Sequence, residues 1–102
     1  MFTKEQIIKL LSSDRDGFDF VEKTRSRYVL YVFDRDDSFE VRLVQHYVDH
    51  FNMKVEELYM EHDFMSKEDQ FGNKTIKKMS LLSEITQMLW KHCLLEGDPV
   101  NE

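Results

Sequence analysis

The sequence contains few of the residues that form disulfides, flexible linkers and phosphate-binding loops. Its 102 residues include one cysteine, one proline, three glycines and no alanine. A single cysteine excludes an internal disulfide and a four-cysteine zinc site, and three isolated glycines do not form a glycine-rich phosphate loop. No apolar run approaches the roughly 18 residues of a membrane-spanning helix. We therefore expect one domain over residues 1–102, without a membrane segment, in the reducing cytoplasm.

Positive charge is also scarce. Fourteen lysines and arginines stand against twenty aspartates and glutamates, which gives a formal net charge of -6. Binding to nucleic acid or to an anionic membrane depends on clustered positive charge, so neither is expected as the main activity. The absence of alanine and the many Met, Phe and Lys residues are typical of a gene poor in G and C. We expect a virus or a mobile element as its origin.

The first third of the chain predicts one helix followed by a pair of strands. Hydrophobic residues make up 41% and aromatics 13%, which is enough to form an ordered core. Thr3 and Gln6 have the spacing of a capping box, and they predict a helix over residues 4–12. Residues 28–33 are a continuous aromatic and β-branched run, typical of a buried strand, with residues 18–23 as its antiparallel partner. The connection lacks Gly, Asn and Asp, so a helix across 18–33 stays an alternative.

The rest of the chain predicts two longer helices. Phe39, Val41 and Leu43 alternate as in a strand, but apolar residues then recur at intervals of three or four, which indicates a helix over residues 45–62. A second helix is expected over residues 80–95, ended by Gly97 and Pro99. The expected fold is therefore a helix-dominated α+β domain with a small antiparallel pair at about 18–33. The alternative is an all-α bundle.

Candidate catalytic and metal-binding patterns are incomplete. His46 and His50 would lie side by side on a helix, the spacing that zinc sites use, but the Glu that follows the first His in zinc proteases is missing. The Asp34 segment resembles the start of a calcium loop and lacks its required Gly and Glu. His92 and Cys93 are neighbours and point apart on a helix. We expect no enzyme activity, no metal and no cofactor.

A DNA-binding regulator is the alternative function. Residues 47–59 are similar to the recognition-helix region of small bacterial repressors, within a helix-turn-helix-like segment near 44–62. The recognition helix would be residues 54–62, which carries acidic residues where groove-reading helices carry Arg, Lys, Asn or Gln. The basic residues form two clusters, and DNA binding requires both clusters on one face. The clusters are Lys23, Arg25 and Arg27, and Lys74, Lys77 and Lys78.

Noncatalytic protein binding is the function that the sequence favours. The aromatic and Met residues are of the types enriched at interface cores, and the acidic residues could face a basic partner such as a nucleic-acid-binding enzyme. We therefore predict a small acidic regulator or inhibitor that binds a protein stoichiometrically, with a homodimer through Trp90 as a further possibility. The predicted partner-binding residues are Asp34, Asp36, Asp37, Glu56, Glu57, Glu61 and Asp63.

Overall fold

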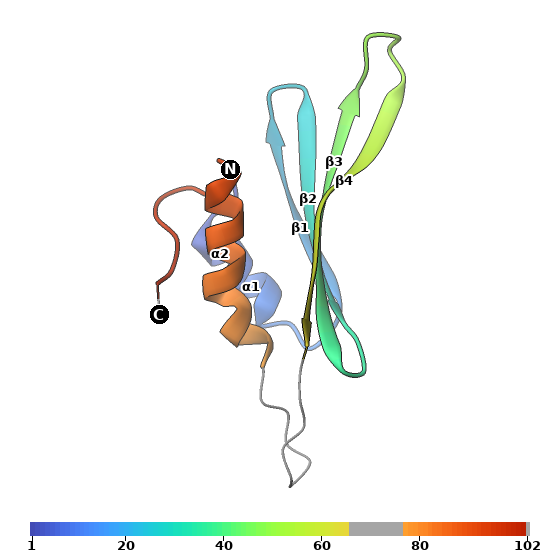
Figure 1. Cartoon of the computed structure of the whole chain (residues 1–102). Helices are drawn as coiled ribbons and strands as arrows, with labels where there is room; N and C mark the ends of the chain where they lie inside the picture. The colour runs from blue at the N-terminus through green and yellow to red at the C-terminus, as the bar shows by residue number, and fades with distance from the viewer. Residues whose placement is uncertain (66–76, 102) are drawn as a thin grey trace, which may run out of the picture.

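A four-stranded antiparallel sheet dominates the part of the chain that the structure describes, residues 1–65 and 77–101 of a computed structural model. The strand order follows the sequence, β1-β2-β3-β4, and both α-helices lie on one side of the sheet (Figure 1). The elements are α1 (Lys4–Leu11), β1 (Gly17–Lys23), β2 (Ser26–Asp34), β3 (Ser38–Val48), β4 (Lys54–Met65), the short 3-10 helix η1 (Lys78–Leu81) and α2 (Leu82–Lys91).

The helix-dominated fold and the all-α alternative are both wrong. Residues 45–62 lie in strands β3 and β4 and in the turn between them, not in a helix. Asp49 forms this turn, because its carboxylate accepts hydrogen bonds from the backbone N–H groups of Phe51 and Met53, at 2.9 and 3.0 Å. The helical spacing of the apolar residues therefore spans a turn, and the strand alternation that begins at Phe39 continues up to it.

Other elements form where the sequence places them. Thr3 accepts a hydrogen bond from the Gln6 backbone while the Gln6 side chain accepts one from the Thr3 backbone, so the capping box of α1 is present. The antiparallel pair at 18–33 is confirmed as β1 and β2. The last helix, expected over 80–95, ends earlier, at Lys91, and Cys93 then adopts a positive φ of 59°.

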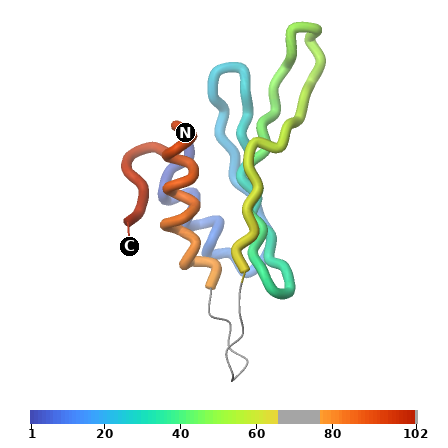
Figure 2. Tube along the Cα trace, viewed as in Figure 1, coloured from blue at the N-terminus to red at the C-terminus, as the bar shows by residue number. Residues whose placement is uncertain are grey.

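The hydrophobic core lies between the helices and one face of the sheet. Leu30 of β2 and Leu43 of β3 are fully buried there, against Ile7 of α1 and against Ile85 and Leu89 of α2. The C-terminal segment then returns along the helix layer. Both ends of the described chain lie on this side of the sheet, so neither crosses to the opposite face (Figure 2).

The β3–β4 pair contains a bulge. Leu43 pairs with Met60 and the next residue, Val44, pairs with Leu58, so Tyr59 is the extra residue. A bulge of this kind bends its strand and increases the local twist. The β3–β4 hairpin extends beyond the β1–β2 hairpin and curves away from it (Figure 1).

Candidate protein-binding face

No described helix or strand covers the second face of the sheet, which we call the open face. Side chains alternate between the two faces of a strand, so the neighbours of the core residues Leu30 and Leu43 project onto the open face. At the centre lies the apolar row, in which strand pairing aligns Phe20, Val29, Val44 and Leu58 across all four strands. Val29 and Val44 are only 4% and 5% exposed, whereas Phe20 and Leu58 are 43% and 52% exposed.

Aromatic side chains extend the apolar row toward the β2–β3 turn. Phe18 and Tyr31 have ring centroids 5.8 Å apart, and Tyr31 stacks on Phe33 at 5.5 Å with an interplanar angle of 13°. Two guanidinium groups lie over rings of this surface, Arg27 over Phe20 at 4.0 Å and Arg35 over Phe33 at 4.9 Å. The rings and guanidinium groups thus hold one another in place.

The arginines of the open face already have interactions within the chain. Arg42 Nε is 3.2 Å from a Glu61 carboxylate oxygen and 3.7 Å from Glu40, and Arg35 Nε is 3.7 Å from Glu40. Arg27 is the third arginine, and it stacks on Phe20. Phosphate binding requires cations that can release counterions and contact the phosphate, so this face is poorly suited to nucleic acid despite its aromatic rings.

The predicted acidic residues do not form one patch. Glu56, Glu61 and Asp63 occupy open-face positions of β4, and Glu56 lies 3.7 Å from His46. Glu57 occupies the other face, where its carboxylate accepts a hydrogen bond from the Tyr47 hydroxyl and raises the pKa of that tyrosine. The remaining three residues lie at the end of β2 and in the β2–β3 turn, and they are Asp34, Asp36 and Asp37.

The described residues of the two basic clusters lie at opposite ends of the sheet. Lys23, Arg25 and Arg27 surround the β1–β2 turn, whereas Lys78 donates hydrogen bonds to the carbonyls of Ser13 and Arg15, which precede β1. Lys77 directly precedes Lys78, and Lys74 lies outside the described residues. The single basic face that DNA binding requires is therefore not formed by the described residues. The segment similar to a recognition helix is the β3–β4 hairpin, so that resemblance does not extend to the structure.

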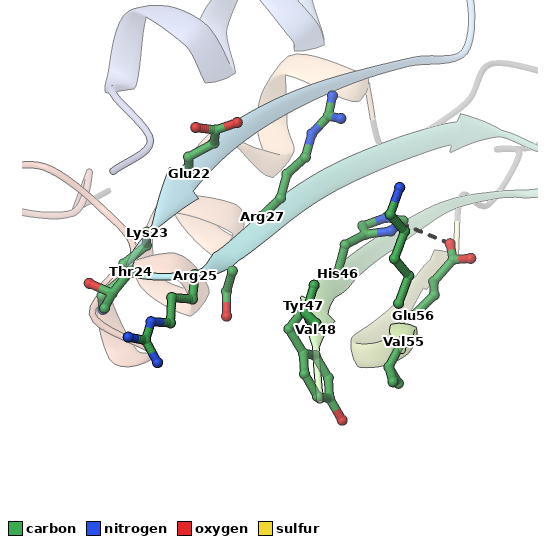
Figure 3. Close-up of a pocket in the computed structure, with 12 residues that line it drawn as sticks. Glu22, Lys23, Thr24, Arg25, Arg27, His46, Tyr47, Val48, Val55 and Glu56 are labelled. Atoms are coloured by element: carbon green, nitrogen blue, oxygen red, sulfur yellow. Dashed lines mark ion pairs between the residues drawn. The ribbon is translucent and has the colours of Figure 1, made fainter. Parts of the chain in front are cut away.

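An open cleft of about 660 Å³ lies between the β1–β2 turn, where β2 begins, and the end of β3. Its lining includes the basic residues Lys23, Arg25, Arg27 and Lys54 together with Glu22 and Glu56. Figure 3 shows the side chains of Arg25 and Tyr47 projecting in a different direction from those of Arg27 and His46. The cations therefore do not converge on one point, and acidic side chains stand among them.

The histidines have a different geometry from the one expected. His46 lies in β3 and His50 in the following turn, so they do not project side by side from a helix. Across residues 1–65 and 77–101, no three side chains of His, Cys, Asp or Glu are grouped closely enough to hold a metal ion. Neither α-helix described has the length and apolar character needed to cross a bilayer.

The exposed apolar residues of the open face are not among the residues that the sequence predicts for partner binding. Phe18, Phe20 and Leu58 belong to this exposed apolar part. The signal was present in β2, whose apolar run continues on both faces, although only one face of an antiparallel sheet needs to be apolar. Comparisons of the chain with protein families, curated proteins and solved structures give no match.

Proposed function

We propose that this chain is a noncatalytic protein-binding domain, a small acidic regulator or inhibitor whose open face is the binding surface. The apolar row carries the proposal, because it crosses the whole sheet and no described element covers it. An apolar centre with aromatic anchors and a charged rim is the usual arrangement of a protein interface. We also place the protein in the cytoplasm, where its exposed Cys93 would stay reduced.

The rim of the open face favours a partner with basic residues along one side. Glu56, Glu61 and Asp63 lie on the open-face side of β4, with Leu58 between Glu56 and Glu61. Arg42 neutralises part of this charge through Glu61. The negative charge that is not neutralised would attract a basic surface and increase the rate of association more than the final affinity. A basic nucleic-acid-binding enzyme, the kind of partner expected from the sequence, has such a surface.

Affinity capture from a nuclease-treated lysate of the native host tests this proposal. Leu58→Lys places a charge in the apolar row at a position that is already half exposed, so the variant should fold. Trp90→Glu is the matched control, because Trp90 is 54% exposed on α2, in the layer opposite the open face. We expect one protein to be retained by the parent and the control and lost by Leu58→Lys. Equal retention by all three, or recovery of nucleic acid alone, would contradict the proposal.

A further inference from the structure

We propose that a second copy of this chain covers the open face in solution, with the two sheets packed face to face about a two-fold axis parallel to the strands. This inference rests on the proposed function, since it names a protein that the open face binds. A partner that uses the same face then competes with the second copy. Self-association would therefore control how much of the binding surface is available.

The apolar row is complementary to itself under this symmetry. An axis between β2 and β3 places β1 of one copy over β4 of the other and keeps each row opposite itself. Phe20 then lies over the partner's Leu58, and Val29 lies over the partner's Val44. The two exposed side chains at the ends of the row pack against each other twice, and the buried valines close the centre. Isologous packing of this type forms a closed dimer.

The neighbouring row adds a cation–π contact between the two copies. Strand pairing aligns Phe18, Tyr31, Arg42 and Glu61 in this row. The same axis places Tyr31 over the partner's Arg42, and Arg42 over the partner's Tyr31. A guanidinium group over an aromatic ring is favourable, and its strength increases when water is excluded. Arg42 keeps its ion pair with Glu61, so dimerisation does not leave an unpaired buried charge.

The area of the face predicts a weak dimer. Four strands about 4.8 Å apart and about six residues of about 3.3 Å each give a plane of roughly 400 Å². Two such faces bury roughly 800–1,000 Å² in total, which is at the lower limit for specific interfaces. We therefore expect a dissociation constant on the order of 10–100 µM, so that monomer and dimer coexist and a tighter partner can displace the second copy.

One row is unfavourable in this arrangement and gives a sharp test of the axis. Glu22, Arg27, His46 and Glu56 are aligned across the strands. The two-fold axis places Glu22 over the partner's Glu56, so two carboxylate pairs repel each other. Glu22→Lys converts both pairs into opposite charges. It should tighten the dimer by about two- to tenfold, because each exposed ion pair contributes little.

Sedimentation equilibrium of the full chain from about 1 µM to about 1 mM measures the association. Trp90→Glu tests the other dimer that the sequence suggests, through Trp90, and we expect this variant to dimerise as tightly as the parent. We expect Leu58→Lys to weaken the dimer about a hundredfold through two symmetric sites, and Glu22→Lys to tighten it. Circular dichroism of Leu58→Lys verifies that the variant is folded. A parent that remains monomeric at about 1 mM, or a dimer that Leu58→Lys does not weaken, would overturn the inference.

The two proposals fail in different ways. If the chain is monomeric and still captures a host protein through Leu58, the dimer is wrong and the proposed function stands. If the dimer forms and depends on Leu58 but no host protein is captured, the function as a regulator of another protein is wrong. A dimer weakened by Leu58→Lys but also weakened by Glu22→Lys would refute the axis parallel to the strands.

Discussion

The β1–β2 turn is predicted to be strained, and replacing Thr24-Arg25 by Asn-Gly should stabilise the protein. Lys23 pairs with Ser26, so only two residues form the turn. Their φ angles are 25° for Thr24 and 65° for Arg25. Two-residue hairpin turns with two positive φ angles favour Asn-Gly. A β-branched threonine is a genuine outlier in this region, and arginine is also disfavoured there.

The magnitude follows from the backbone conformation. The left-handed region costs a residue with a Cβ roughly 1–2 kcal/mol, so the two positions together store about 2–4 kcal/mol. Glycine at the second position reduces this gain by roughly 0.5–1 kcal/mol, because it increases the entropy of the unfolded chain. The expected net gain is about 1–3 kcal/mol. For a domain of this size, each kcal/mol raises Tm by roughly 4–8 °C.

Urea denaturation followed by circular dichroism measures this gain for the double variant Thr24→Asn, Arg25→Gly. Arg25→Ala is the control, because it removes the charge and leaves a Cβ in the left-handed region. We expect the control to stay within about 0.5 kcal/mol of the parent. A double variant that is no more stable than the parent would show that the turn carries no strain and would refute the reasoning.

The remaining predictions concern the core, the C-terminal segment and alkaline pH. Leu30→Ala removes a fully buried side chain from the centre of β2 and should cost about 2–5 kcal/mol in the free energy of unfolding measured with urea; a loss below about 1 kcal/mol would contradict the core position. Thr86→Val should release the last residues of the chain, because the Thr86 hydroxyl accepts a hydrogen bond from the Val100 N–H at 3.0 Å and donates one to the Ser83 carbonyl at 3.1 Å. Limited proteolysis should then cleave the C-terminal segment faster than in the parent, and unchanged protection would refute this anchor. The Glu57 carboxylate raises the pKa of Tyr47 above its ordinary value of 10.0, so the stability from this hydrogen bond is fully present below that pH and is lost as the pH rises through the folded pKa. The difference in unfolding free energy between the parent and Tyr47→Phe should therefore shrink on the alkaline side, and a constant difference would contradict the assignment.

Short local patterns of the sequence predict their elements well. The capping box of Thr3 and Gln6 involves groups three residues apart, so nothing distant can change it. The run at 28–33 contains aromatic and β-branched residues on both faces, and a strand uses both. These signals identify α1 and β2 without knowledge of the rest of the fold.

Residues 45–62 show where such patterns fail. Val44, Tyr47, Val48 and Phe51 have helical spacing, yet the hydrogen bonds of Asp49 turn the chain between the last two of them. The decisive interactions are the long-range pairs of β3 with β2 and β4, which local periodicity does not reveal. Tertiary pairing therefore overrides the helical signal.

The open face depends even more on distant residues. Phe20 and Leu58 are almost forty positions apart, and the strand register alone brings them into one row. In the sequence, each of them is an ordinary apolar residue of a strand. Which side of that strand faces the helices is decided by the pairing of all four strands, and for β4 also by the bulge at Tyr59.

The acidic residues of β4 also have a structural role, because they disfavour pairing at the exposed edge of the sheet. β4 is an edge strand of twelve residues, and an exposed edge of that length is a template for another strand. Glu56, Glu57, Glu61 and Asp63 place negative charge on both faces of this strand, which disfavours pairing with a second β4. Pairing of β4 with a second β4 would leave the β1 edge of each copy open for further strands, whereas the proposed association through the open face closes after two copies. Repulsion at the edge therefore favours the proposed face-to-face contact over edge pairing. Neutralising these four residues should produce assemblies larger than a dimer in sedimentation equilibrium.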